Sequence, residues 1–265
     1  MAALISTSLG ASPAFALDWD LTPTLNARAR FTDNVNQSAD NPESALILSV
    51  TPGFSLLTKG SRRVQARLRY GLTGVTRVGG DTNSNDLNHN LSAVGKAELV
   101  EDFLFFDGTA RISQELISLL GSPADANTNS SNRATVGTYS FSPYIKKRLG
   151  TFATAQARYT HSGAIFGDNA GSNISANALT ASLGSGTQFN DINWSLDYSL
   201  REAEYANNGT TRASSSTFES TSATLGYALS RKFRVFGTVG RDSNDFINAS
   251  QSNGKFYMAG FGWSP

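Results

Sequence analysis

Trp194-Ser195-Leu196-Asp197-Tyr198-Ser199-Leu200-Arg201 is the stretch of this sequence that best indicates the fold. Apolar and polar side chains alternate along it, and a β-strand places successive side chains on opposite faces. The stretch therefore predicts a strand with one apolar face and one charged face. In a soluble sandwich the apolar face would form the core. In an outer-membrane barrel it would contact lipid, while the charged face would line a water-filled lumen.

Twelve segments of the chain show this alternation, and no helical pattern interrupts them. The predicted strands lie near residues 19–32, 45–58, 62–77, 88–100, 103–116, 134–146, 151–162, 177–189, 192–204, 216–229, 233–242 and 255–264. A tilted strand needs about 9–11 residues to cross a bilayer, and all of these segments are that long. The mean strand of a soluble protein has only about 5–6 residues. Strand length therefore favours a membrane barrel.

The predicted connections alternate between long and short. The long ones are rich in Asn, Ser and Gly and cover residues 33–44, 79–87, 117–133, 162–176, 205–215 and 242–254. In an up-and-down sheet, odd and even connections lie at opposite ends, and outer-membrane barrels have long external loops and short periplasmic turns. We therefore expect an all-β, up-and-down antiparallel transmembrane β-barrel of about 12 strands, with these strands as part of a larger barrel as a further expectation.

The composition excludes several classes of protein. The chain has no cysteine, which rules out disulfides, thiol nucleophiles and cysteine-bound metals. Its net charge of +1 gives no overall field toward nucleic acid, so we expect no nucleic-acid partner. Aromatic residues make up 10% of the chain, and together with the regular alternation they argue against disorder.

The two ends of the sequence differ from the rest. Residues 1–16 are uncharged and end in Ala14-Phe15-Ala16, which matches the small-residue pattern of signal-peptide cleavage sites. We expect a signal peptide remnant over residues 1–16 and a barrel over residues 17–265. The chain ends in Ser264-Pro265 instead of an aromatic residue, so we expect the barrel to be incomplete at its C-terminus.

The charged faces of the predicted strands supply the candidate site. The side chains expected to line the lumen are Arg28, Arg30, Arg67, Arg69, Lys96, Glu98, Asp107, Arg111, Arg158, Asp197 and Arg201. Cations outnumber anions among them, which predicts a weak preference for anions if the lumen is open. The alternative is that these charges pair across strands and fill the lumen.

No motif indicates catalysis or metal binding. The two histidines, His89 and His161, lie near predicted loops, and no spacing pairs either of them with a nucleophile. Neighbouring Asp and Asn residues could offer oxygen ligands, but their spacing fits no calcium loop and turn chemistry explains them. They lie at Asp33-Asn34, Asp168-Asn169 and residues 242–245. We therefore expect a non-enzymatic protein without metal or cofactor.

Five short stretches carry a resemblance to a known family. They are Trp19–Leu25, Phe31–Asn36, Val50–Leu56, Ser142–Ile145 and Gly260–Pro265. They resemble the outer-membrane proteins found with bacterial PEP-CTERM/exosortase systems. The resemblance implies an outer-membrane β-barrel linked to exopolysaccharide export or protein sorting. The partners it implies are outer-membrane lipid or lipopolysaccharide, and polysaccharide or periplasmic export components. It supplies no catalytic residues.

The sequence thus predicts a channel or scaffold in the outer membrane, with two alternatives. One is a membrane-embedded barrel enzyme, which would need an inward constellation around His89 or His161. The other is a soluble secreted β-sandwich or adhesin, which would bury Leu68, Leu196 and Leu225 beneath a second layer.

Overall fold

The structure is a computed structural model that describes residues 18–37, 39–79, 84–117, 132–167, 171–206, 214–246 and 249–264. The signal peptide predicted for residues 1–16 lies outside the described residues. Every regular element in the described part of the chain is a β-strand. No helix among those residues is long and apolar enough to cross a membrane.

Twelve strands follow one another along the chain. They are β1 Asp18–Thr32, β2 Ala45–Lys59, β3 Val64–Val78, β4 Ser84–Val100, β5 Leu104–Leu116, β6 Arg133–Leu149, β7 Ala153–Phe166, β8 Ile174–Ser185, β9 Ile192–Tyr205, β10 Ser214–Ala228, β11 Phe233–Phe246 and β12 Ala249–Trp263. Each predicted strand corresponds to one of them.

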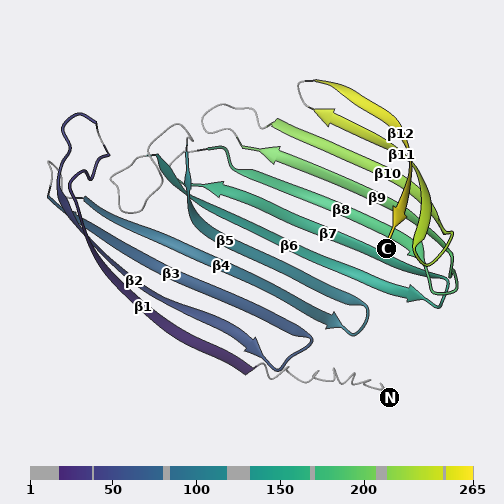
Figure 1. Cartoon of the computed structure of the whole chain (residues 1–265), viewed down its shortest axis with the longest axis horizontal. Coiled ribbons are helices and arrows are strands. Elements are labelled where there is room, and N and C mark those ends of the chain that lie inside the picture. Colours follow the sequence, from purple (N-terminus) through teal and green to yellow (C-terminus); the bar gives the residue numbers. More distant parts are fainter. Residues whose placement is uncertain are drawn as a thin grey trace, which may run out of the picture.

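The strands form a single sheet in the order of the sequence, from β1 to β12. Each pairs antiparallel with its sequence neighbours, and Figure 1 shows them side by side in one curved sheet with β1 and β12 at its two ends. Among the described residues the sheet is open between these two strands. The predicted all-β, up-and-down antiparallel architecture is confirmed.

The polar face of the sheet is its more buried face. Ile47, Val75, Ala203 and Thr238 are nearly inaccessible, and the pairing registers place all four on the same face as the predicted lumen charges. The opposite face carries most of the exposed large apolar side chains of the strands. Among them are Leu21, Leu25, Phe31, Leu196, Leu225, Tyr257 and Phe261. An apolar outer face around a polar inner face is the arrangement of a membrane barrel.

The soluble sandwich is therefore wrong. Leu196 and Leu225 are 52% and 61% exposed, and no second layer covers the sheet in the described part of the chain. Two side chains of this size exposed on one continuous apolar face would be unfavourable in water but not in hydrocarbon.

Several predicted boundaries are also wrong: β4 begins at Ser84 instead of near residue 88, β7 ends at Phe166 instead of near residue 162, and two further errors have a clear physical cause. β8 ends at Ser185, four residues before its expected end, because the chain then turns: the Gly186 amide donates to the Phe152 carbonyl and the Phe189 amide donates to the Gly186 carbonyl. The Phe189 ring packs against Phe152 and Trp194 at the turn end of the sheet, with centroids 5.5 and 6.0 Å away. Phe189 is therefore apolar because it belongs to this aromatic cluster, although it lies outside the strand.

The expected long connection at residues 242–254 is the second error. β11 runs on to Phe246 and β12 begins at Ala249, with Asp242 opposite Gly254 and Asn244 opposite Ser252. Backbone hydrogen bonds continue the ladder whatever the side chains, so polar residues extend the hairpin beyond the apolar band. Asn and Ser residues therefore indicate that a segment lies outside the hydrocarbon of the membrane, but they do not distinguish a strand from a loop.

Candidate functional site

Every predicted lumen residue lies on the charged, more buried face of the sheet. The registers bring several of them into common rows across the strands: Arg69 on β3 and Arg111 on β5 flank Ser92 on β4, and Lys96 on β4 lies directly opposite Asp107 on β5. Most of the cations are exposed to solvent on this face. The exposed cations are Arg28, Arg30, Arg67, Arg69, Lys96, Arg111 and Arg201.

The predicted acidic residues of this face each accept a hydrogen bond. Asp107 is half-buried, and its Oδ2 accepts a hydrogen bond from Nη1 of Arg158 at 2.8 Å. Glu98 is also half-buried, and its Oε1 accepts the backbone amide of Asp102 at 2.6 Å, which fixes the turn between β4 and β5. Asp197 is the exposed acid of the predicted set, and it accepts Oγ–H of Ser195 at 2.7 Å. Positive potential therefore dominates the exposed part of this face.

Arg158 also belongs to an aromatic cluster. Its guanidinium carbon lies 3.8 Å from the centroid of the Tyr144 ring, close enough for a cation–π interaction. Tyr144 in turn stacks on Phe105, with centroids 5.0 Å apart. Arg158, Asp107, Tyr144 and Phe105 thus form one contiguous group across β5, β6 and β7.

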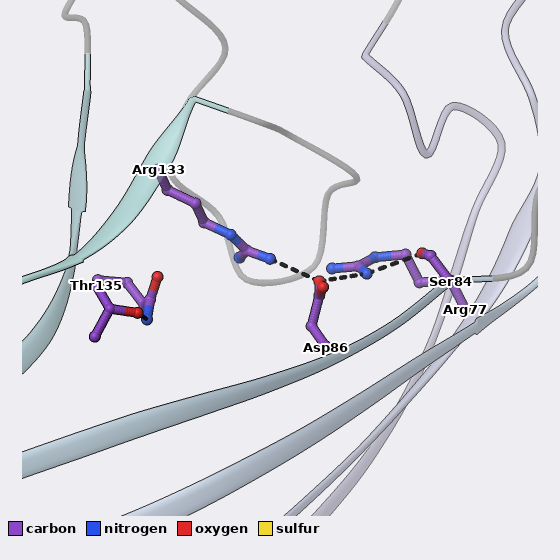
Figure 2. A network of polar contacts seen from close by, with 6 residues as sticks. Arg77, Ser84, Asp86, Arg133 and Thr135 are labelled. Carbon is purple, nitrogen blue, oxygen red and sulfur yellow. Dashed lines mark hydrogen bonds and ion pairs between the residues drawn. The ribbon is translucent and has the colours of Figure 1, made fainter. Parts of the chain in front are cut away.

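A second ionic network lies near the loop end of the charged face, and the sequence did not predict it as a unit. Figure 2 shows Arg77 and Arg133 reaching Asp86 from two sides. Nη1 of Arg77 lies 2.7 Å from Oδ2 of Asp86, and Nη2 of Arg133 lies 2.9 Å from the same oxygen. Arg77 also donates to Oγ of Ser84 at 3.1 Å, and its side chain is only 1% exposed.

A small apolar core accompanies this network. Val35, from the connection between β1 and β2, packs with Ala45, Ile47 and Val75 on the charged face. The Val35 amide donates to the Glu43 carbonyl at 2.8 Å, which holds the two sides of that connection together. The connection therefore packs Val35 against the inner face at the loop end of the sheet.

The histidines lie on the opposite, apolar face. His89 accepts or donates one hydrogen bond with the Tyr70 hydroxyl at 2.8 Å, and His161 contacts the Tyr139 hydroxyl at 3.3 Å and Oδ1 of Asn177 at 2.8 Å. Tyr and Asn near the outer ends of strands are suited to the membrane–water interface. The inward constellation that a barrel enzyme would build on His89 or His161 is not formed.

Of the oxygen-rich segments that the sequence assigned to turns, Asp33-Asn34 shows turn chemistry, whereas residues 242–245 lie within strand β11. The Asn34 amide donates to Oγ1 of Thr32 at 3.3 Å. Asp168 and Asn169 lie outside the described residues. Within the described ranges there is no group of three or more His, Asp or Glu side chains that could hold a metal ion.

No protein-family model matches the chain, and no curated protein matches it. A solved structure is similar to it: OmpTΔL8, a loop L8 deletion mutant of OmpT, an outer membrane protein of Vibrio cholerae. The two sequences are 10% identical, and the match covers 93% of this chain and 99% of that chain with a TM-score of 0.42. At this identity the likeness concerns the fold alone.

The predicted localisation in the outer membrane agrees with the exposed apolar face of the sheet. A long-stranded up-and-down sheet whose apolar face is exposed and whose charged face is sheltered is an outer-membrane β-barrel wall. The chain is an outer-membrane protein.

The expectation that the protein is not an enzyme is corrected here. It rested on the lack of a recognisable catalytic motif. The lack of a motif gives no ground for ruling catalysis out, because a fold of this kind hosts unrelated functions.

Proposed function

We propose that this protein is an outer-membrane channel whose charged inner wall favours anions. The observation that carries the proposal is the imbalance on that wall: Arg67, Arg69 and Arg111 are exposed, whereas Asp107 is paired with Arg158 and Glu98 with a turn amide. Walls of low dielectric constant focus such a field, which raises the local concentration of anions.

The experiment is a reversal-potential measurement on the purified protein in a planar lipid bilayer under a KCl gradient. The expected reversal potential has the sign of a chloride preference, and it shrinks as ionic strength rises because salt screens the wall charges. A potassium preference, or no conductance from a barrel shown to be folded by heat-modifiable gel migration, would contradict the proposal.

The wider role follows from the sequence resemblance. We propose a place in surface-polysaccharide export or in PEP-CTERM protein sorting, with lipopolysaccharide around the barrel and polysaccharide or periplasmic export components as partners. Deletion of the gene tests this: loss of surface polysaccharide or of a sorted protein would support the role, and unchanged levels of both would contradict it.

A scaffold is the second candidate function. The connection between β1 and β2 packs Val35 onto Ile47 and Val75, and the network around Asp86 lies on the same face near the loop end. A lumen closed by these groups would leave a wall without a pore. Zero conductance from the folded protein would favour this candidate over the channel.

A further inference from the structure

Phenylalanine rings recur on the charged face of the last three strands. We call them the phenylalanine ladder, which consists of Phe218 on β10, Phe236 and Phe246 on β11, and Phe256 on β12. Phe236 lies directly opposite Gly260, and Phe256 lies directly opposite Gly240. Phe218 and Phe246 contact each other edge to face, with ring centroids 5.5 Å apart.

The tips of two of these rings lie over glycines. A methyl group placed on Gly240 would come within 2.2 Å of Cζ of Phe256, and one placed on Gly260 would come within 2.6 Å of Cζ of Phe236. Each ring therefore covers the backbone of the glycine opposite it. Both rings are only half-buried, so the ring face that points away from the sheet stays accessible on the inner side of the wall.

Polar groups alternate with the rings along β11. Between the levels of Phe236 and Phe256 lies Thr238, whose hydroxyl is 2.9 Å from that of Thr224. Between the levels of Phe256 and Phe218 lies Asp242. The levels of Phe236, Phe256 and Phe218 are each four residues apart, which is about 13 Å along a strand at about 3.3 Å per residue, and Phe246 lies two residues beyond Phe218. The Asp242 carboxylate lies between two of these levels, whereas Thr238 is nearly buried and lies opposite Met258, whose exposed side chain adds apolar surface between Phe236 and Phe256.

The charges beside the ladder balance. Asp197 shares a row with Gly240 through Ser222, and Arg201 lies directly opposite Phe218. Asp242 and Arg234 add one charge of each sign on β11. This part of the wall therefore lacks the cationic excess of β1, β3 and β5, and it is complementary to a polar ligand without net charge.

We propose that the phenylalanine ladder binds the pyranose rings of an uncharged oligosaccharide as it passes along the inner wall. The C–H groups on one side of a pyranose carry partial positive charge and fit the negative face of an aromatic ring. Sugar hydroxyls can donate to the Asp242 carboxylate, which lies on the same face between the levels of Phe256 and Phe218. This inference depends on the proposed channel function in one respect: the charged inner face must be in contact with water.

The other aromatic pair on the inner face does not provide such a platform. Phe105 and Tyr144 stack on each other, and the guanidinium of Arg158 covers Tyr144. Their faces are already occupied, so sugar binding is assigned to the ladder alone.

The test is calorimetric titration of the folded protein with maltohexaose and cellohexaose in tetraethylene glycol monooctyl ether, a detergent without a sugar head group. At least one hexaose binds, and glucose binds more weakly because it reaches only one platform. Phe236→Ala and Phe256→Ala each raise Kd about tenfold, the equivalent of one good stacking contact. Phe256→Trp keeps the affinity because it preserves a flat ring.

Tyr257→Ala is the matched control, since Tyr257 neighbours Phe256 but lies on the apolar face and is 76% exposed. It leaves Kd unchanged. Failure of both hexaoses to bind, equal weakening by Tyr257→Ala, or tighter binding of an anionic hexagalacturonate would overturn the inference. The same preparations are tested for conductance: a conducting barrel that binds no sugar overturns only this inference, and a binding barrel that does not conduct overturns only the channel.

Discussion

Arg158 on β7 and Asp107 on β5 form an ion pair that spans the intervening strand β6, with 2.8 Å between Nη1 and Oδ2. Neighbouring strands are already joined by backbone hydrogen bonds, so this contact adds a connection between strands that share none. Both side chains are about one-third exposed or less, which shields the pair from full solvent screening.

Replacing Arg158 by Met should therefore lower the free energy of unfolding by about 1 kcal/mol, through loss of the ion pair and of the contact with Tyr144. Urea unfolding of the protein in detergent measures this. A double-mutant cycle with Asp107→Asn should give a coupling energy of about 0.5–1 kcal/mol. Additive effects of the two substitutions would show that the pair contributes nothing.

The network at the loop end should be more sensitive. Asp86→Asn removes a carboxylate that Arg77 and Arg133 share, and Arg77 is almost wholly buried. We expect a loss of about 2–3 kcal/mol in unfolding free energy, because a buried guanidinium loses a charged hydrogen-bond acceptor. The exposed Asp33 provides the control: Asp33→Asn should change stability by less than about 0.5 kcal/mol. Similar values for the two variants would contradict the role given to Asp86.

Ion selectivity should depend on the exposed arginines. The double substitution Arg67→Gln, Arg69→Gln should reduce the chloride preference measured by reversal potential, since both side chains are exposed on the inner face. Arg231→Gln, in the exposed turn between β10 and β11, should leave the reversal potential unchanged. An equal effect of the turn substitution would mean that the inner wall does not set selectivity.

The two faces should respond in opposite ways to a new charge. Val239 on the apolar face is 52% exposed, and Val239→Arg should destabilise the folded protein in bilayers by about 2–4 kcal/mol if it lies near the midplane. Ser222, on the neighbouring strand and the charged face, should tolerate arginine far better. Refolding yield into lipid vesicles across a denaturant series measures both. Equal tolerance at the two positions would argue against lipid contact on the apolar face.

Glycines beneath aromatic rings should resist substitution. A methyl group at Gly163 would lie 2.7 Å from the Tyr139 ring and 2.8 Å from the Ile174 carbonyl oxygen, so Gly163→Ala should cost about 1–3 kcal/mol. Gly95, in β4, has nothing within 4 Å of the same position. Gly95→Ala should therefore be neutral or slightly stabilising, and thermal shift of the gel-mobility transition compares the two variants.

Period-two alternation was sufficient to predict the sheet. It placed every strand, and it placed Arg69, Asp107 and Arg201 on one face, because the side-chain period of a strand is a local property. It could not separate strand from loop where both are polar, and for this reason the hairpin of β11 and β12 is longer than expected.

The contacts between distant segments could not be predicted. Arg133 donates a hydrogen bond to Asp86, which is 47 residues away in the sequence. Val35 contacts Ile47 because the connection between β1 and β2 packs against the inner face. Pairing of Arg158 with Asp107 depends on the rotamers of two side chains on separate strands. The sequence contains one indication of the phenylalanine ladder, because Phe236, Gly240 and Phe246 share a face of β11 with polar residues. The placement of rings over glycines depends on the register between β11 and β12, which the sequence pattern does not give.

All the strand pairings in this sheet join consecutive segments of the chain, so they can form as successive hairpins. In the described part of the chain, β1 and β12 each have one strand neighbour, and the other edge of each is a row of backbone donors and acceptors along 15 residues. Hydrocarbon makes every unmet amide or carbonyl cost several kcal/mol. We therefore expect insertion into the bilayer to be unfavourable until the free edges of β1 and β12 are paired.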